Sequence, residues 1–376
     1  MLHKTIDFSS LAVSGVRALQ PYQPGKPESA LKREYGLDDV IKLASNENPM
    51  GPGTRAIEAA GAELQGAHRY PDGAGFALRH ALAERHAVDP MQVTLGNGSN
   101  DVLALVANAF LEPGREAVFS AHAFAVYPIV TQAAGASAVV VPANAPDHAM
   151  PFGHDLEAMA AAVSERTRVV FVANPNNPTG TWLQADPLRA FLQGLPAEVI
   201  AVVDEAYFEY ADDPDYPDAS LWLQEFPNLV VTRTFSKAHG LAALRVGYGL
   251  SHPAVADLLN RVRQPFNVSS VAQAAALASL ADQDYIAQSV ALNREQRDWL
   301  RQALQSMGLQ VLPSAGNFLC FRVGERADAI YEGLLRRGVI LRPVANYALP
   351  GFLRVTVGLP AENARFVEAL QAELRA

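Results

Sequence analysis

The stretch NLVVTRTFSKAHGLAALR (228–245) decides how the rest of this chain is interpreted. Its first half is an apolar, β-branched run typical of a buried strand. Lys237 stands where that strand should end, Arg245 follows it, and no acidic residue between the two is available to pair with either. A lysine at such a place is usually a solvated surface residue. Whether Lys237 is one depends on the remaining sequence.

Composition sets the broad class. The chain has 376 residues, of which 49% are hydrophobic, enough for roughly two to three domains with large cores. Acidic residues outnumber basic ones by 39 to 30, and no cluster of Lys and Arg suited to nucleic-acid phosphates occurs. The start lacks the pattern of an export signal, and no apolar run approaches ~18 residues. We therefore expect a soluble, cytoplasmic protein that binds neither nucleic acid nor membrane.

Metal and nucleotide motifs are missing from the sequence. The single cysteine, Cys320, excludes an intramolecular disulfide and a thiolate cluster, and its setting predicts a buried place in a strand. The nine histidines include no HExxH motif and no pair at i, i+4, so no metal is expected. GNGSND (96–101) lacks the third glycine of a dinucleotide motif, and GKP (25–27) lacks the Ser/Thr of a P-loop.

Short apolar runs alternate with helical patterns through the first two thirds of the chain. The runs are β-branched and mostly continuous, as in strands covered on both faces, and they lie at 92–96, 116–121, 136–141, 168–175, 198–207, 228–235 and 245–251. A helical pattern over 101–114 has Ser99 or Asn100 as its expected cap. These patterns predict an α/β fold with a large domain over 46–265 and a mostly parallel central sheet.

A second, smaller α/β domain is expected over 266–376, together with the helices that link it to the first. Long helical patterns precede three expected strands, which alternate with two further helices; the strands are NFLCFRV (317–323), VILRPV (339–344) and FLRVTVG (352–358). Residues 1–45 are rich in Pro, Gly and charge. We expect this N-terminal segment to pack on the small domain or on a neighbouring subunit.

Ligands of open parallel sheets bind beyond the carboxyl ends of the strands. GNGSND opens a helix there, where free backbone N–H groups suit a phosphate, and Phe124 could cover a flat ring. The turn NPNNPTG (174–180) leaves Asn177 as a positioned amide donor. Asp204 follows five apolar residues, so its carboxylate should be partly buried and paired.

One cofactor needs this combination of groups. Pyridoxal 5'-phosphate requires an amine for its aldehyde, an acid facing its ring nitrogen, and donors to its ring oxygen. It also requires a cover for its ring and cationic and backbone donors for its phosphate. Each requirement has a candidate at an expected strand end, so Lys237 is predicted to be the amine.

Three of these motifs, NPNNPTG, VVDEAY (202–207) and TFSKAHGLAALR (234–245), resemble those of the fold-type I aminotransferases in order and separation. The resemblance covers nearly the whole chain. It is most specific for the histidinol-phosphate aminotransferase branch, through SNENPMGP (45–52), HRYPDG (68–73), GNGSND, SKAHGLAALRVGYG (236–249) and LRVTVG (353–358).

The resemblance implies a role for each cofactor-binding residue. Lys237 would form the Schiff base with the cofactor and transfer the proton between the substrate Cα and the cofactor C4′. Asp204 would hold the proton of the pyridine nitrogen. Tyr207 and Asn177 would hydrogen-bond the ring oxygen. Phe124 takes the ring-stacking place, where tyrosine is frequent, and cannot supply a hydroxyl. The phosphate would be held by Thr234, Ser236, Arg245 and the backbone at Gly98, Ser99 and Asn100.

The resemblance also implies substrate residues. Arg354 matches the arginine that grips the substrate's anionic end, although an arginine in a strand by itself suggests a cross-strand ion pair. Arg342 and Tyr22 match positions that join it in binding a phosphate. Tyr70 resembles a tyrosine contributed by the other subunit, which implies a homodimer with shared active sites.

The implied reaction moves an amino group between histidinol phosphate and 2-oxoglutarate, forming glutamate, by a ping-pong mechanism through pyridoxamine phosphate. The residues themselves lead to the cofactor, and the substrate follows from the resemblance. An aromatic amino-acid aminotransferase and a threonine-phosphate decarboxylase, which is a lyase, are the alternatives. A regulator that uses the fold as a ligand sensor is a third, disfavoured because no DNA-binding segment precedes the fold.

Overall fold

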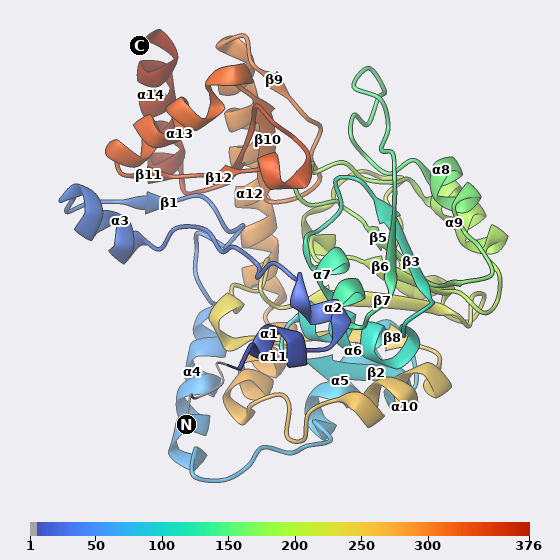
Figure 1. The fold of residues 1–376 in the computed structure, drawn as a ribbon. Coiled ribbons are helices and arrows are strands. Elements are labelled where there is room, and N and C mark those ends of the chain that lie inside the picture. The colour runs from blue at the N-terminus through green and yellow to red at the C-terminus, as the bar shows by residue number, and fades with distance from the viewer. Residues whose placement is uncertain (1–5) are drawn as a thin grey trace, which may run out of the picture.

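The protein is described by a computed structural model that covers residues 6–376. Residues 1–5 of the expected N-terminal segment lie outside the described residues. The chain forms two parts, each built on its own sheet, and the long helix α12 (Gln283–Ser306) runs from one part to the other (Figure 1). The predicted α/β class with a large, mostly parallel sheet is confirmed.

The large part contains a seven-stranded sheet in the order β2-β8-β7-β6-β5-β3-β4. β8 runs antiparallel to both its neighbours, and the pairs from β7 to β4 are parallel. The strands are β2 (Val93–Gly96), β3 (Glu116–Ser120), β4 (Ser137–Val141), β5 (Thr167–Ala173), β6 (Ile200–Asp204), β7 (Leu229–Thr234) and β8 (Gly247–Ser251). Each lies within the run that predicted it or within one residue of it.

Both faces of this sheet are buried except at its edge strand β4, which explains the continuous apolar runs. In β5, Val170 and Val172 belong to one core cluster, and Val169 and Phe171 belong to a second cluster on the opposite face. The helices of this part are α4 (Thr54–Glu63), α5 (Phe76–His86), α6 (Ser99–Phe110), α7 (Val126–Ala133), α8 (Leu156–Ala161), α9 (Ala185–Gly194), α10 (Pro253–Val262) and α11 (Ser270–Ala281).

The cap predicted for α6 is wrong. Gly98, rather than Ser99 or Asn100, occupies the N-cap position, with φ 79° and no side chain to bond the first N–H groups. Ser99 is the first residue of the helix. The prediction failed because it assumed a side-chain cap, whereas the chain leaves the start of this helix uncapped.

The smaller part contains a four-stranded sheet in the order β12-β13-β10-β9. The strands are β9 (Gln310–Val311), β10 (Phe318–Arg322), β12 (Arg342–Pro343) and β13 (Phe352–Thr356), and α13 (Ala327–Arg336) and α14 (Pro360–Arg375) complete the part. VILRPV, expected as one strand, divides at Leu341. Its first half, β11 (Val339–Ile340), pairs with β1 (Ile41–Lys42), and only its second half joins the four-stranded sheet.

Residues 6–45 contact both parts. α3 (Glu28–Tyr35) places Leu31 in a cluster with Leu335 and Ile340 of the smaller part, whereas α1 (Phe8–Leu11) leads into α2 (Ser14–Arg17), which packs on α7. The domain boundaries at residues 45 and 265 stay a prediction.

Short 3-10 helices lie at Leu64–Gly66, Pro90–Gln92, Phe208–Tyr210, Ala219–Trp222, Ala242–Leu244, Gly324–Arg326 and Ala345–Tyr347. Within residues 6–376 we find no helix of the length and apolarity needed to cross a membrane.

Candidate active site

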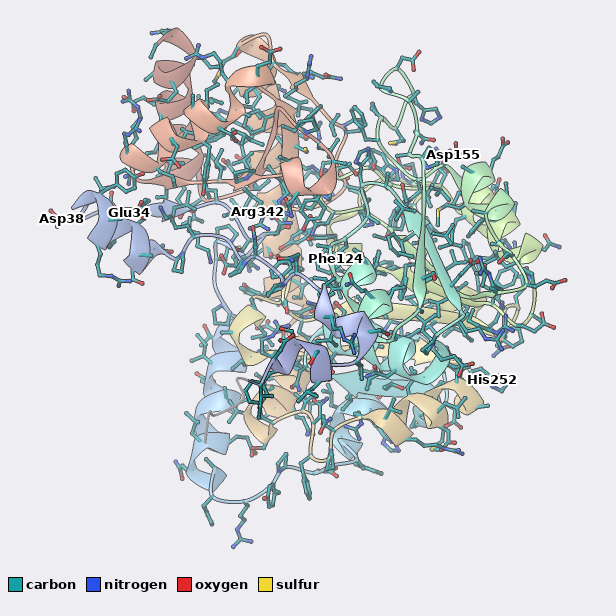
Figure 2. All side chains as sticks on the ribbon, in the orientation of Figure 1. Glu34, Asp38, Phe124, Asp155, His252 and Arg342 are labelled. Atoms are coloured by element: carbon teal, nitrogen blue, oxygen red, sulfur yellow. The ribbon has the colours of Figure 1, made fainter. Side chains whose placement is uncertain are left out.

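A pocket lies between the two parts, over the carboxyl ends of the parallel strands. Phe124 on the side of the large sheet and Arg342 on the side of the small sheet both line it and lie between the two parts of the molecule (Figure 2). Because β8 is antiparallel, its amino end lies at the same edge and brings Arg245 there. Predicted residues lining the pocket are Tyr22, Ser99, Asn100, Phe124, Asn177, Asp204, Tyr207, Thr234, Ser236, Lys237, Arg245, Arg342 and Arg354.

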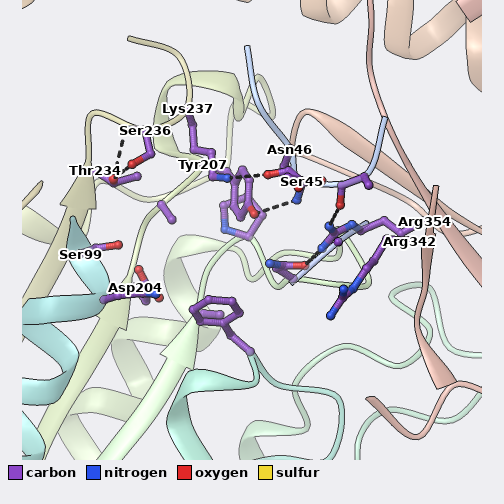
Figure 3. A pocket seen from close by; sticks show the side chains of 18 of the residues that line it. Ser45, Asn46, Ser99, Asp204, Tyr207, Thr234, Ser236, Lys237, Arg342 and Arg354 are labelled. Atoms are coloured by element: carbon purple, nitrogen blue, oxygen red, sulfur yellow. Dashed lines mark hydrogen bonds between the residues drawn. The ribbon is translucent and has the colours of Figure 1, made fainter. Parts of the chain in front are cut away.

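Lys237 is not a solvated surface lysine. Its side chain points into the pocket, and its Nζ donates a hydrogen bond to the backbone oxygen of Ser45 at 3.1 Å (Figure 3). Burial lowers the pKa of Lys237 to about 7, and the nearby guanidinium groups of Arg354 and Arg245 act in the same direction. A large fraction of this amine is therefore neutral near pH 7, which makes it a nucleophile and a base.

Asp204 ends β6 and is buried, and it has the partners that its burial requires. The Tyr127 hydroxyl donates to Oδ2 at 3.0 Å, and the Thr232 hydroxyl donates to Oδ1 at 2.8 Å. Burial raises the pKa of Asp204, and the two hydrogen bonds oppose this shift. A cationic ring nitrogen in front of the carboxylate would favour its charged form further.

One end of the pocket is suited to a phosphate. Ser99 and Asn100 open α6, whose uncapped N-terminus carries free N–H groups and the positive end of the helix dipole. Thr234 donates to the Ser236 hydroxyl at 3.0 Å, and an Arg245 nitrogen lies 3.3 Å from the same Ser236 oxygen. A Cβ at Gly98 would lie 2.4 Å from the Arg245 guanidinium, so any other residue there would displace this side chain or the helix start.

Tyr207 and Asn177, which the resemblance assigned to the ring oxygen of the cofactor, both line the pocket. The Tyr207 hydroxyl accepts a hydrogen bond from Nδ2 of Asn46 at 2.9 Å. Burial raises the pKa of Tyr207 to about 12, so its hydroxyl stays protonated at neutral pH. Oδ1 of Asn177 accepts a hydrogen bond from Arg354, which leaves its Nδ2 group free to donate elsewhere.

Arg354 and Arg342 form the opposite end of the pocket. They are directly paired across β13 and β12, and the other strand neighbour of Arg354 is Cys320, so the cross-strand ion pair considered above does not occur. Arg354 donates to the backbone oxygen of Ala44 at 2.6 Å, and Arg342 donates to that of Gln23 at 2.7 Å. Within residues 6–376 neither arginine forms a salt bridge, and Nε of Arg354 is buried without a hydrogen-bond partner.

Two predicted residues lie at the edge of the site or outside it. Tyr22 lines the pocket from the N-terminal segment, with its ring 5.9 Å from the Arg342 guanidinium carbon. Tyr70 lies outside the pocket of its own chain, is 80% exposed, and stacks on the Phe266 ring at 4.4 Å.

Three residues whose side chains hydrogen-bond to the predicted set were missed. Thr232 is the cross-strand partner of Asp204, and Tyr127 lies one helical turn beyond Phe124. Asn46 was present in the quoted SNENPMGP motif without a role. Only Tyr127 had a sequence signal for its position, which was its spacing from Phe124. The partners of Thr232 and Asn46 depend on the fold.

No group of three or more His, Cys, Asp or Glu side chains in residues 6–376 could hold a metal ion.

Comparison with known proteins agrees with this geometry. The family model "Aminotransferase class I and II" matches residues 38–370. The chain belongs to this family of pyridoxal-phosphate-dependent aminotransferases. Within the family it groups with proteins named histidinol-phosphate aminotransferase 2: one from Pseudomonas fluorescens (strain Pf0-1) is 58% identical over 98% of both chains, and one from Pseudomonas aeruginosa is 59% identical over 97% and 98%.

A solved structure has the same fold. The histidinol-phosphate aminotransferase from Sinorhizobium meliloti, in complex with pyridoxal-5'-phosphate, is 30% identical and matches with a TM-score of 0.88 over 97% of this chain and 98% of its own. The pocket residues fit this cofactor. One cavity contains an amine without an acidic partner, a buried carboxylate, a phenol hydroxyl, a side-chain amide and an uncapped helix N-terminus.

Proposed function

We propose that this enzyme transfers an amino group between L-histidinol phosphate and 2-oxoglutarate, with pyridoxal phosphate bound covalently through Lys237. The names of its relatives support the choice of substrate. The observation that carries the proposal is the arginine pair: Arg342 and Arg354 lie side by side on the pocket wall without a carboxylate partner in the described chain.

The large sheet would hold the cofactor. Asp204 would face the ring nitrogen, Tyr207 and Asn177 the ring oxygen, and Phe124 the ring itself. The start of α6, Thr234, Ser236 and Arg245 would bind its phosphate, for which backbone N–H groups and a guanidinium supply partial and full positive charge. When bound, pyridoxal phosphate supplies an electron-withdrawing ring that stabilises negative charge at the substrate carbon bearing the amino group.

Lys237 would move the proton. Its neutral form at pH 7 can take the hydrogen from the substrate Cα as a general base, and the same amine can return a proton afterwards. Tyr207 keeps its hydrogen at this pH and therefore acts as a fixed donor rather than as a second base. The walls of the pocket also come from both parts of the molecule, which limits the access of water to the reacting carbon.

The arginine pair would select the phosphate substrate. Two guanidinium groups and the Tyr22 hydroxyl provide more donors than one carboxylate can accept, whereas a phosphate offers three acceptor oxygens and up to two charges. Each buried donor left unpaired by a smaller anion costs roughly 1–3 kcal/mol. 2-Oxoglutarate and glutamate would use the same arginines through a carboxylate. One substrate must then leave before the other binds, which is a ping-pong mechanism.

The exposed Tyr70 supports a shared site. We propose that the chain forms a homodimer in which Tyr70 enters the pocket of the partner subunit. Its ring and the stacked Phe266 ring are exposed by 80% and 47%, and further exposed apolar side chains occur on the neighbouring helices α4 and α5, among them Ile57 and Phe76. Exposed aromatic pairs of this kind are typical of protein interfaces.

The decisive experiment compares substrates in two arginine variants. In the parent enzyme, kcat/KM for histidinol phosphate should exceed that for histidinol by about a hundredfold or more, since at least two donor partners are lost. Arg342→Ala should lower kcat/KM for histidinol phosphate more than for glutamate, and Arg354→Ala should lower both.

Three outcomes would contradict the proposal. Unchanged turnover of histidinol phosphate in Arg342→Ala would remove the phosphate-binding role. A preference of the parent enzyme for phenylalanine would indicate an aromatic aminotransferase. Release of carbon dioxide from threonine phosphate would indicate the decarboxylase.

A further inference from the structure

Asn46 has no role in the assignments above, although it occupies the centre of the site. It is 1% exposed and has a left-handed backbone with φ 54°, a conformation that asparagine tolerates better than most residues. Its backbone N–H donates to the Thr356 hydroxyl at 2.9 Å, and its backbone oxygen accepts from the Asn317 side chain at 3.1 Å. The backbone N–H and the backbone oxygen of Asn46 are therefore both held by the smaller part of the molecule.

The orientation of the Asn46 amide follows from these contacts. The Thr356 oxygen accepts the backbone N–H of Asn46, and its own hydrogen is donated to Oδ1 of Asn46 at 3.2 Å. With Oδ1 facing Thr356, the Nδ2 group faces Tyr207 and donates to its hydroxyl at 2.9 Å. Within the described residues these contacts leave the hydrogen of the Tyr207 hydroxyl without an acceptor.

The polarity of this contact decides where the Tyr207 hydrogen points. A phenol has one hydrogen to donate, and the amide N–H group of Asn46 cannot accept it. In the described chain the Tyr207 hydroxyl has no other hydrogen-bond partner, and Tyr207 lines the pocket. Its hydrogen is therefore directed into the pocket, and a hydroxyl that accepts one hydrogen bond becomes a better donor of the next.

We propose that Asn46 is a positioning residue that turns the Tyr207 hydroxyl into an obligatory donor toward the ring oxygen of the cofactor. This inference rests on the proposed function, in which Tyr207 faces that oxygen. Asn46 itself acts through Tyr207, because its amide nitrogen is already engaged with the phenol.

The same segment connects this donor to the substrate end of the pocket. Ala44 accepts a hydrogen bond from Arg354 and Ser45 accepts one from Lys237, so residues 44–46 contact the anion-binding arginine, the reactive amine and the phenol in turn (Figure 3). Thr356 follows Arg354 by two residues on β13, on the same face of the strand.

The test uses Asn46→Asp in the holoenzyme. Aspartate is nearly isosteric and tolerates the same backbone, but both of its oxygens accept, so it would draw the Tyr207 hydrogen away from the cofactor. The readout is the pH midpoint of the visible absorption change of the bound cofactor. A hydrogen bond to the ring oxygen anion lowers that midpoint, so its loss should raise the midpoint by about one to two pH units.

A double-mutant cycle separates this effect from the new charge. Tyr207→Phe alone should raise the midpoint by a similar amount, and adding Asn46→Asp to Tyr207→Phe should cause little further change. A full, undiminished shift in the Tyr207→Phe background would overturn the inference, because the effect would then bypass the phenol. An unchanged midpoint in Asn46→Asp, with a shift in Tyr207→Phe, would overturn it as well.

A second pair of variants guards against misfolding at residue 46. Thr356→Val removes the hydroxyl that orients the Asn46 amide and should raise the midpoint, whereas Thr356→Ser keeps that hydroxyl and should leave the midpoint at the parent value. Equal midpoints in these two variants would contradict the inference. A midpoint that does not move in Tyr207→Phe would instead contradict the placement of Tyr207 in the proposed function.

Discussion

At the scale of single residues, the lysine at the end of β7 shows how its surroundings set its chemistry. Lys237 lines the pocket together with three arginines and forms no salt bridge in the described chain. Burial is the largest cause of its lowered pKa, and the positive charges of Arg354 and Arg245 add to it. The same group on the surface would be almost fully protonated at neutral pH.

This pKa predicts how fast the apoprotein takes up its cofactor. Only the neutral amine attacks an aldehyde, so the rate of covalent uptake should rise about tenfold per pH unit below pH 7 and level off above it. Absorbance changes after mixing apoprotein with pyridoxal phosphate would measure the rate. Free lysine blocked at its α-amino group is the control, since its side chain should show a midpoint near ~10.4.

The variant Arg354→Ala refines this prediction. It removes a positive charge that disfavours the protonated amine, so the midpoint of uptake should move to higher pH. A midpoint near 10 in the parent protein would show that Lys237 is not held in a desolvated, cationic environment.

At the scale of elements, the start of α6 lies at the pocket without a side-chain cap. Gly98 has a positive φ and lies against the Arg245 guanidinium, and the first N–H groups of the helix remain without a capping side chain. A capping serine or aspartate would occupy the donors that a phosphate needs.

Gly98→Ala should therefore weaken cofactor binding. The added Cβ would lie 2.4 Å from the Arg245 guanidinium, so this side chain or the helix start must move, and we expect the dissociation constant of pyridoxal phosphate to rise about tenfold or more. Titration of the apoprotein followed by absorbance would measure it.

Gly114→Ala is the matched control. Gly114 also has a positive φ, but a Cβ there meets nothing within 4 Å. Both variants should lose stability through backbone strain, by roughly 1–3 kcal/mol, and Gly98→Ala should lose more because its ψ of 167° lies in a region essentially restricted to glycine. Thermal unfolding would report this loss, and only Gly98→Ala should lose affinity for the cofactor. Equal dissociation constants in the two variants would argue against a phosphate at this helix end.

At the scale of the whole molecule, the site is built between two sheets and, in our proposal, between two subunits. One wall carries Lys237 and Asp204 from the large sheet, and the other carries Arg342 and Arg354 from the small one. The N-terminal segment adds Tyr22. Tyr70 remains exposed at a surface of its own chain.

Mixing two inactive variants tests the shared site. If Tyr70 acts in the pocket of the partner subunit, Tyr70→Ala and Lys237→Ala protomers together should form mixed dimers in which one site has both residues. Activity should then recover to about a quarter of the parent level for random exchange, since half of the dimers are mixed and each has one working site. Transaminase assays after verified subunit exchange would measure this. Absence of recovery would mean that each site is complete within one chain.

Local features of the fold could be predicted from the sequence. The strand runs, the buried place of Cys320 and the long helix α12 follow from patterns within a few residues of each other. The division of VILRPV into two strands could not be predicted, because it depends on the pairing of β11 with β1, which is far away in the chain. The uncapped start of α6 could not be predicted either, because it depends on the backbone conformation of Gly98.

By itself the sequence determined which chemical groups stand at the strand ends, because that is a matter of neighbouring residues. Only the tertiary structure decided which groups meet. Tyr127 reaches Asp204 across 77 positions, Asn46 reaches Tyr207 across 161, and Arg342 lies beside Arg354 through the pairing of β12 with β13. Such contacts depend on strand order, direction and register, which arise when both faces of a sheet are buried at once and which no single run of residues encodes.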